Sequence, residues 1–284
     1  MWKNYLLLCF TAFIASHCSS DRNLDEDNKS GNIITIVDTL TKEKNGDIDS
    51  LVIIAHKGFW DYSGGVENSL QAFNYAQKLK VHGIEFDVRM SKDSILYVHH
   101  DEKIFNSVFS NLSSSELDRI AISKSEKIPR LSSFLDSFDQ SSDALLYIDI
   151  KTSSDESYNK LFVKKILELL THYNISAKHK LLINNFSLFK YLKEYNSVYK
   201  TVMVLGGNNI YYKLLEYYKV DELAVKYEDF DIYEKEFSKI KTLGMHINLF
   251  TINNLDDIRR FHKNKLITGI ITDRPDRAMK IIKK

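Results

Sequence analysis

The chain has 284 residues, of which 44% are hydrophobic and 27% charged, a composition typical of a soluble globular protein with one core or at most two. Its 39 Lys and Arg residues balance 38 Asp and Glu residues, which argues against nucleic acid as a partner, and nothing in the sequence indicates a protein partner. Both cysteines, Cys9 and Cys18, lie near the amino terminus, so disulfides and thiolate metal ligands are excluded from the rest of the chain.

The amino terminus has the layout of a secretory signal. Lys3 precedes an apolar run at 5–15 that is too short to span a membrane, and Cys18 follows shortly after it. Residues 1–17 therefore resemble a bacterial lipoprotein signal, and Cys18 would be the lipidated first residue of an exported chain held at the cell envelope. His17 replaces the small residue expected there, so secretion without a lipid is the alternative. A buried first helix is disfavoured because polar sequence follows at once.

Residues 18–50 are polar and acidic apart from 33–37, and this predicts a tether with at most one short strand. The folded domain is expected to begin at Leu51 and to extend to the end of the chain, over 51–284. No internal sequence repeat is present.

Short apolar runs alternate with helical patterns from Leu51 onward, as in a parallel sheet covered by helices. The predicted strands are 51–56, 83–88, 145–150, 180–185, 200–205, 222–227, 246–251 and 267–272, and helical patterns between them include 69–80, 158–173 and 255–264. Eight such units in about 230 residues predict a single (β/α)8 TIM barrel. A short insertion after the second strand, within 90–144, should hold an extended piece and a short helix at 114–120. An open doubly wound parallel sheet is the alternative.

Three acidic residues lie late in two of the predicted strands. Glu85 and Asp87 are two apart on one strand and so point to the same side, and Asp149 ends the next strand. Buried carboxylates are costly unless a cation joins them, and oxygen ligands without thiolates suit Mg²⁺ or Ca²⁺. Glu85 and Asp87 alone could instead form a solvated strand edge or an ion pair with Arg89. Asp149 and the nearby histidines favour the metal site.

Two histidines and two lysines accompany these carboxylates. His56 closes the first strand and His100 follows the extended piece, and imidazoles can accept or donate a proton near neutral pH. Lys57 and Lys151 would place positive charge beside the metal, which suits an anionic substrate such as a phosphodiester. The remaining histidines of the folded domain are expected to be structural: His82, His99, His172, His179, His246 and His262.

The segment Glu67-Asn68-Ser69 has two interpretations. Asn68 or Ser69 can cap a helix, with Glu67 favourable near its positive end. A direct role in the site is equally compatible with the sequence.

In their order along the chain, these residues resemble the glycerophosphodiester phosphodiesterase family. The resemblance runs from about Ile53 to Arg277 and rests on the ordered motifs AHKG (55–58), VENS (66–69), IEFDV (84–88), HHD (99–101), IPRL (128–131), YIDIK (147–151) and ITDRP (271–275). Each motif is weak alone, whereas the ordered set is specific. The start of the domain looks most like secreted or lipid-anchored members from Bacteroidetes-type bacteria.

The resemblance implies a TIM barrel that hydrolyses glycerophosphodiesters with a divalent metal. It implies the following roles: His56 and His100 as the acid/base pair, Glu85, Asp87 and Asp149 as metal ligands, Lys57 and Lys151 as phosphate contacts, and Phe250 as an apolar wall for the glycerol or the leaving alcohol.

The sequence departs from the family pattern at several positions. Lys57 replaces the usual Arg and loses its planar fork for two phosphate oxygens. Asp149 replaces the usual Glu, and the shorter ligand slightly favours Ca²⁺, which tolerates irregular geometry, over Mg²⁺. Ser94 and Asn185 stand where Gly and Ser are usual, with no consequence that the sequence reveals.

The sequence therefore predicts metal-dependent hydrolysis of a small glycerophosphodiester to glycerol phosphate and an alcohol. One alternative keeps the fold and the metal but acts on intact phospholipids. Another is a lipid-anchored binding protein whose catalysis has decayed through Lys57 and Asp149.

Overall fold

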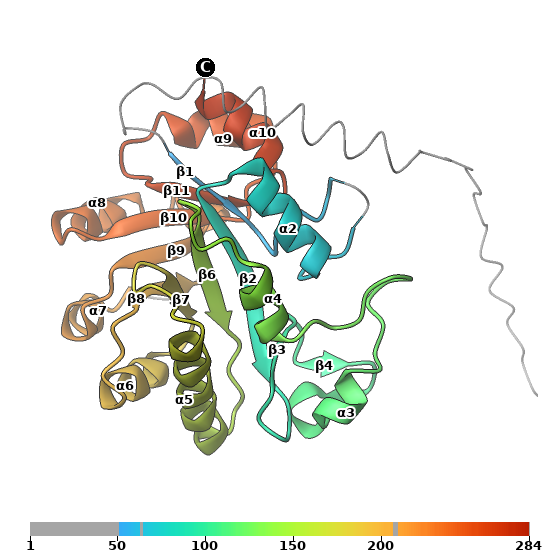
Figure 1. Ribbon diagram of the computed structural model, residues 1–284. Coiled ribbons are helices and arrows are strands. Elements are labelled where there is room, and N and C mark those ends of the chain that lie inside the picture. Colours follow the sequence, from blue (N-terminus) through green and yellow to red (C-terminus); the bar gives the residue numbers. More distant parts are fainter. Residues whose placement is uncertain (1–50, 63–64, 207–209, 284) are drawn as a thin grey trace, which may run out of the picture.

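The computed structural model of the chain describes residues 51–62, 65–206 and 210–283 (Figure 1). The predicted signal at 1–17, its Cys18 and the tether at 18–50 lie outside the described residues. In the described part, no helix combines the length and the apolar composition needed to cross a membrane.

Eight parallel strands close into a barrel, as the sequence predicts. They are β1 (Val52–Ala55), β2 (Gly83–Met90), β6 (Leu145–Ile150), β7 (Lys180–Ile183), β8 (Lys200–Leu205), β9 (Glu222–Lys226), β10 (His246–Phe250) and β11 (Gly269–Thr272). The sheet order is β1-β11-β10-β9-β8-β7-β6-β2-β3, and β1 also pairs with β2. That last pairing leaves the parallel sheet no free edge, so the alternative of an open doubly wound sheet is wrong.

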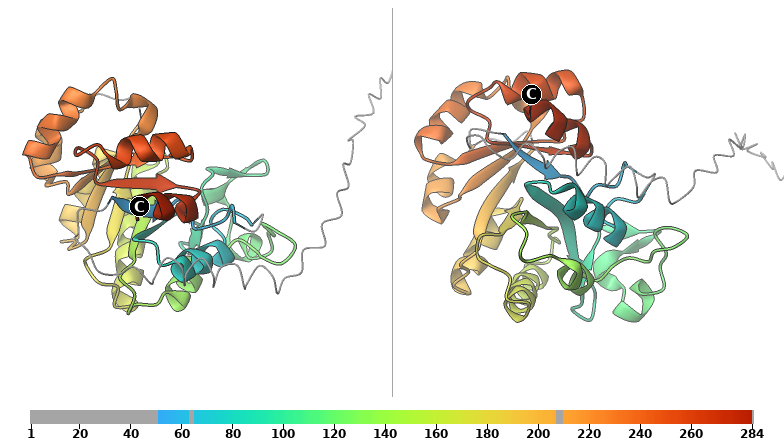
Figure 2. Two further views of the ribbon diagram at one scale, coloured as in Figure 1. Left: turned by 90° about the horizontal axis from the view of Figure 1, so that it is seen from above. Right: turned by 45° about the horizontal axis from the view of Figure 1, so that its top comes forward.

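A helix follows each barrel strand and covers its outer face (Figures 1 and 2). These helices are α2 (Leu70–Leu79), α4 (Leu131–Ser137), α5 (Glu156–His172), α6 (Phe186–Glu194), α7 (Tyr212–Tyr218), α8 (Glu234–Thr242), α9 (Leu255–His262) and α10 (Pro275–Ile282). Several begin at a side chain that accepts a backbone N–H: Ser69 for α2, Asp155 for α5, Asn185 for α6 and Asn254 for α9.

The hydrophobic core has two parts. A large shell between strands and helices contains apolar side chains from nearly every element, and a smaller cluster fills the barrel interior: Ile54, Tyr147, Leu182, Val202, Ala224 and Ile271. Lys180, near the amino-terminal end of the barrel, pairs there with Glu222, and Glu222 also accepts a hydrogen bond from Asn248. The interior is thus a packed core whose polar groups are paired, and the carboxyl ends of the strands are left to form a site.

The predicted insertion leaves the barrel after β2. It contains β3 (Leu96–Val98), which runs antiparallel to β2, a hairpin of β4 (Lys103–Ile104) and β5 (Ser107–Val108), the 3₁₀ helix η1 (Phe109–Asn111) and the helix α3 (Ser114–Leu117), which is shorter than predicted. A second 3₁₀ helix, η2 (Tyr227–Asp229), follows β9. The insertion after β2 has a small core of its own, made of Tyr97, Phe109, Leu117 and Ile128. Through β3, the insertion brings the segment around His100 back to the carboxyl ends of the barrel strands.

Candidate active site

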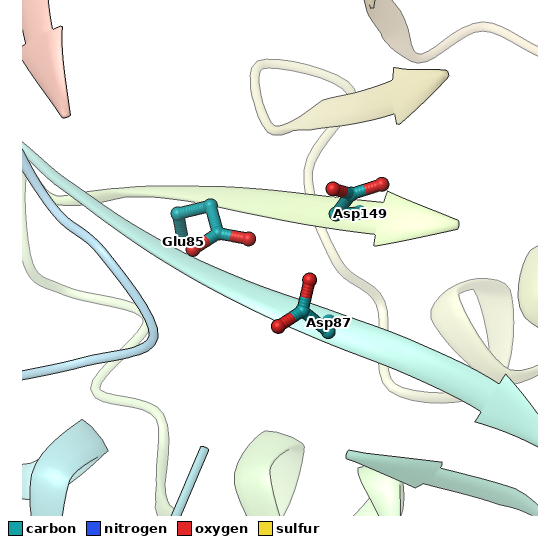
Figure 3. Close-up of side chains that lie close together, drawn as sticks. All are labelled: Glu85, Asp87 and Asp149. Carbon is teal, nitrogen blue, oxygen red and sulfur yellow. The ribbon is translucent and has the colours of Figure 1, made fainter. Parts of the chain in front are cut away.

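Three buried carboxylates form the centre of the site. Glu85 and Asp87 project from the same side of β2, and Asp87 lies directly across from Asp149 on β6 in the parallel register. Ligand atoms of the three side chains lie within 4.8 Å of one another (Figure 3). The fold thus brings together the three acids that the sequence assigns to one metal site.

The pKa values of the three acids are shifted in different directions. Burial, and then the charge of Asp87, raise the pKa of Glu85 to about 8, and burial likewise raises the pKa of Asp149. Burial also opposes ionisation of Asp87, but the Lys151 ammonium, the charge of His100 and a hydrogen bond from Asn68 outweigh it and lower its pKa. Asp87 is therefore the most firmly ionised of the three.

The donor set fits a hard divalent cation. All three ligands are carboxylates, and among the described residues Asp149 Oδ1 is a buried oxygen without a hydrogen-bond partner. An unsatisfied buried carboxylate oxygen costs free energy, and a bound cation would satisfy it. Glu85, Asp87 and Asp149 are thus the residues of the described chain that could hold a metal ion.

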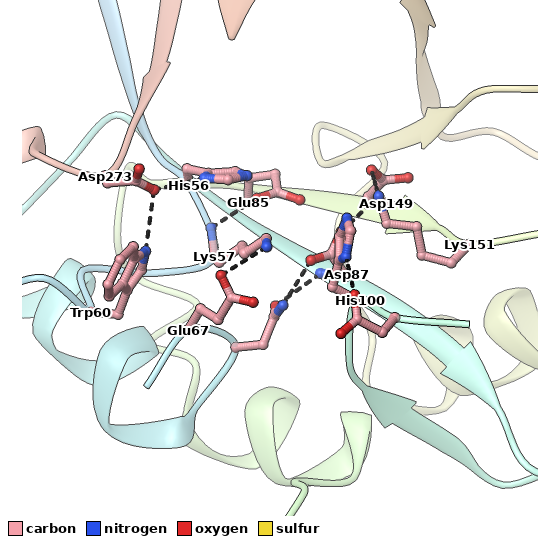
Figure 4. A network of polar contacts seen from close by, with 12 residues as sticks. His56, Lys57, Trp60, Glu67, Glu85, Asp87, His100, Asp149, Lys151 and Asp273 are labelled. Atoms are coloured by element: carbon pink, nitrogen blue, oxygen red, sulfur yellow. Dashed lines mark hydrogen bonds and ion pairs between the residues drawn. The ribbon is translucent and has the colours of Figure 1, made fainter. Parts of the chain in front are cut away.

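His56 is fixed at the rim by a carboxylate from the far end of the chain. Its Nδ1 lies 2.7 Å from Oδ1 of Asp273, and Trp60 Nε1 donates to the same oxygen at 3.2 Å (Figure 4). Asn253 Nδ2 donates to the other oxygen of Asp273 at 2.6 Å. Burial lowers the pKa of His56, but the bond to Asp273 and the charges of Glu85 and Asp273 outweigh it, so the pKa is raised.

His100 lies on the other side of the acids. Its Nδ1 is 2.9 Å from Oδ1 of Asp101, and Arg89 Nε donates to its backbone carbonyl at 2.9 Å. The lowered pKa of Asp101, due first to its hydrogen bond with His100, keeps that carboxylate ionised. Both candidate acid/base imidazoles therefore have a carboxylate at Nδ1, which leaves Nε2 of each ring for proton transfer.

The two lysines are held by acidic side chains. Lys57 Nζ donates to Glu67 at 2.8 Å, and Lys151 Nζ lies 2.9 Å from Asp87 Oδ1 and 2.7 Å from Asp149 Oδ2. Asp149 and Asp87 raise the pKa of Lys151 although burial works against its charge. Both lysines line the same cleft, and Lys151 neutralises part of its negative charge.

The loop after β1 places the backbone as well as the side chain of Lys57. Lys57 has a φ of 53°, and its N–H donates to Glu85 Oε2 at 2.8 Å. Gly58 has a φ of 81°, and a Cβ there would lie 2.7 Å from the backbone carbon of Ala72. Gly58 therefore permits a close approach of this loop to the start of α2.

The ambiguous segment Glu67-Asn68-Ser69 proves to have both functions. Ser69 caps α2 by accepting from the Ala72 N–H at 3.0 Å. Asn68 forms two hydrogen bonds with Asp87: its Nδ2 donates to Asp87 Oδ2 at 2.7 Å, and its Oδ1 accepts from the Asp87 N–H at 3.1 Å. One residue therefore starts the helix while its neighbour orients a candidate metal ligand.

A cleft of about 270 Å³ joins these groups and has two unlike halves. The polar half consists of His56, Lys57, Glu85, Asp87, His100, Asp149 and Lys151, and the apolar half is made of Leu182, Val204, Ala224, Phe250 and Ile271, next to Thr251. Every predicted site residue within the described chain therefore reaches one cleft. Cys18 lies outside the described residues.

Three of the six histidines predicted to be structural, His82, His99 and His179, make structural contacts. Nδ1 of His82 accepts from the Ile53 N–H, and Nδ1 of His179 from the Leu146 N–H, each at 3.0 Å. His99 stacks on Phe109 with ring centres 5.2 Å apart.

Sequence reasoning missed Asp273 and the residues around it. The ITDRP motif was recognised, but no role was given to its aspartate, because only the closed barrel brings β11 beside β1. Its place directly after a predicted strand was the signal that could have found it. Trp60 and Asn253 have no comparable signal.

Comparison with known proteins agrees with this geometry. Residues 56–277 match the model of the glycerophosphoryl diester phosphodiesterase family. A glycerophosphodiester phosphodiesterase from Bacillus altitudinis is 28% identical over 81% of this chain and 97% of its own length, and one from Bacillus subtilis is 24% identical over 88% and 93%.

Solved structures show the same fold. A glycerophosphodiester phosphodiesterase from Parabacteroides distasonis superposes with a TM-score of 0.76 at 21% identity, over 83% of this chain and 98% of that one. A phosphodiesterase from Oleispira antarctica, solved with its product sn-glycerol-3-phosphate, gives 0.72 at 20% identity over the same shares. Since the family model covers most of the chain, including every residue that lines the cleft, the protein belongs to the glycerophosphoryl diester phosphodiesterase family of phosphoric diester hydrolases.

Proposed function

We propose that this protein hydrolyses a glycerophosphodiester to glycerol phosphate and an alcohol in a reaction that requires a divalent cation and two histidines. The observation that carries the proposal is the meeting of Glu85, Asp87 and Asp149 with His56 and His100 in one cleft. A cation on the three carboxylates would neutralise the non-bridging phosphate oxygens.

The side chains of the cleft supply the remaining chemistry. One of His56 and His100 removes the proton of the nucleophile, which is water or a neighbouring substrate hydroxyl, and the other protonates the leaving oxygen. Asp273 and Asp101 hold the two rings by Nδ1. Lys57 and Lys151 bind the phosphate, and Phe250 forms an apolar wall for the glycerol or alcohol.

Ca²⁺ is the cation that we favour over Mg²⁺. The third carboxylate is an aspartate, and Lys151 lies between it and Asp87. Such a centre is irregular, and Ca²⁺ tolerates irregular geometry better than Mg²⁺, which demands a near-ideal octahedron.

We also propose that the enzyme is exported and attached to the cell envelope by a lipid on Cys18, as in the secreted or lipid-anchored members that its sequence resembles. The support is the sequence of residues 1–18.

The size of the cleft favours a soluble diester over an intact phospholipid. Its volume of about 270 Å³ is small beside the roughly 300–1,000 Å³ of sites for drug-sized ligands. A glycerophosphodiester headgroup suits such a volume, whereas two acyl chains would need a longer apolar groove.

The test is release of glycerol phosphate from a panel of glycerophosphodiesters by the purified chain, with Ca²⁺, with Mg²⁺ and with EDTA. We expect turnover only with a cation, and a loss of about 10²–10⁴-fold in His56→Ala and in His100→Ala. His172→Ala, on the exposed end of α5, is the matched control and should keep full activity. Activity that survives EDTA, or persists in both active-site variants, would overturn the mechanism.

A further inference from the structure

A second and larger cavity lies on the outside of the barrel, between α9 and α10. Its volume is about 620 Å³, and these two helices pack side by side near the carboxyl terminus (Figures 1 and 2). Leu255 on α9 and Ile281 on α10 give it an apolar floor, and both are only partly buried. Nothing in the hydrolysis described above uses this groove.

The rim of the groove is entirely basic. Lys263, Arg277 and Lys280 line it, are exposed, and form no ion pair with a described residue. Arg259 also lines it and pairs with Asp256 at 2.7 Å, and no acidic side chain lines the groove. Solvated lysines are common on protein surfaces, but three unpaired cations around one hollow leave a positive potential that nothing in the groove balances.

Helical spacing explains how the cations gather. Leu255, Arg259 and His262 recur at intervals of four and three on α9, and Arg277, Lys280 and Ile281 share one face of α10. His262 Nδ1 is also a buried nitrogen without a hydrogen-bond partner in the described part of the chain. The facing sides of α9 and α10 together place cations at the rim of the groove and apolar side chains at its floor.

We propose that this α9–α10 groove binds the headgroup of an anionic phospholipid at a membrane surface. Arg and Lys are the side chains that bind phosphate oxygens, and the Leu255–Ile281 floor suits the apolar part adjoining an anionic headgroup. An inorganic anion would leave that floor uncovered. The proposal does not depend on the hydrolytic mechanism or on a lipid at Cys18.

Vesicle co-sedimentation tests the proposal. The full chain carrying Cys18→Ser, which cannot be lipidated there, is mixed with neutral phosphatidylcholine vesicles and with vesicles that also contain phosphatidylglycerol. The neutral vesicles measure any binding through the apolar run at 5–15. We expect clearly stronger binding to the anionic vesicles, since each Lys or Arg near an anionic surface contributes about fivefold in partitioning.

Paired variants of equal charge change locate the binding surface. Lys263→Gln with Lys280→Gln should lower binding to the anionic vesicles by about 25-fold. Lys213→Gln with Lys235→Gln, on the exposed surfaces of α7 and α8, is the matched control and should change it by less than about twofold. Unchanged turnover of a soluble diester shows that both variants are folded.

Three results would overturn the proposal. The first is equal binding to both kinds of vesicle, and the second is an equal loss in both paired variants, which would reflect net charge alone. The third is displacement by inorganic phosphate at constant ionic strength, which would assign the groove to a free anion.

Discussion

His56 Nδ1 and Asp273 Oδ1 lie 2.7 Å apart although the two residues are 217 positions apart in the chain. His56 directly follows β1 and Asp273 directly follows β11, and these two strands are neighbours in the closed barrel. Trp60 and Asn253 donate to the same carboxylate and fix its position. Asp273 is therefore a positioning residue that sets both the orientation and the proton affinity of His56.

Replacing this carboxylate should weaken catalysis and shift its pH dependence. In Asp273→Asn, one carboxylate oxygen is replaced by an amide NH₂, which cannot accept a hydrogen bond from the donors around it. His56 therefore loses its fixed orientation, and its raised pKa falls. We expect kcat to fall by about 10- to 100-fold, a part of the 10²–10⁴ that a positioned acid or base contributes. The limb of the pH–rate profile that reports His56 should move to lower pH.

The pH–rate profile distinguishes a role of Asp273 in holding His56 from a role in stabilising the fold. Asp231→Asn removes a surface partner of Arg260 and should leave both rate and profile unchanged. A slower Asp273→Asn enzyme with an unshifted profile would mean that Asp273 supports the fold and not His56.

Lys151 should oppose cation binding while aiding turnover. Its ammonium lies within 2.9 Å of Asp87 and Asp149, so Lys151→Met, which keeps length but not charge, leaves the carboxylates more negative. We expect cation affinity to rise about tenfold and kcat/KM to fall about 100-fold with the phosphate contact. Without a cation, the free energy of unfolding should fall by about 3 kcal/mol, because a buried pair is broken.

Calorimetric titration with Ca²⁺ and turnover at saturating Ca²⁺ measure the two effects separately. Lys160→Met, which breaks a surface pair with Glu194, should change neither. Weaker cation binding by Lys151→Met would show that the lysine supports the metal site.

Glu85 should destabilise the cation-free protein at alkaline pH. Its pKa is raised to about 8 by burial and by Asp87, so Glu85 keeps its proton to a higher pH in the folded state than in the unfolded chain. The stabilising effect of that proton is complete below the unfolded pKa of 4.5 and is lost as pH rises through about 8, at about 1.4 kcal/mol per pH unit. Glu85→Gln, which keeps an acceptor for the Lys57 N–H, should remove this loss.

Denaturant unfolding in EDTA at several pH values checks the prediction. The advantage of Glu85→Gln over wild type should grow between pH 5 and pH 9, and added Ca²⁺ should stabilise wild type but not the variant. An advantage that is constant with pH would contradict the assignment to Glu85.

His179 should give the opposite pH dependence at acidic pH. Burial lowers its pKa from 6.5 to about 4, and its Nδ1 accepts the Leu146 N–H, so the folded state favours the neutral ring. Its contribution to stability is therefore complete above pH 6.5 and is lost as pH falls toward 4, by at most about 1.4 kcal/mol per pH unit.

The His179→Gln variant offers an amide oxygen as acceptor and carries no titrating group. Its free energy of unfolding should fall less steeply than that of wild type between pH 6.5 and pH 4. His246→Gln, at an exposed position, is the control that should follow wild type.

The sequence alone determined the barrel strands and the carboxylate centre of this protein. Strand periodicity is local, so all eight strands were found, and alternation put Glu85 and Asp87 on one side. Parallel strands expose their carboxyl ends at one edge, which brought Asp149 to the same place. The histidines and lysines followed from their positions at strand ends and from the ordered motifs, and Phe250 followed from the family resemblance.

Only the tertiary structure decided which of these groups touch. Closure through the β1–β2 pairing excluded the open sheet and placed Asp273 against His56. The double hydrogen bond from Asn68 to Asp87, the pairing of Lys57 with Glu67 and the gathering of basic residues between α9 and α10 also appeared only in three dimensions. Periodicity specifies the side on which a residue points, whereas its partner depends on strand register, barrel closure and helix packing, which are set by contacts far apart in the chain.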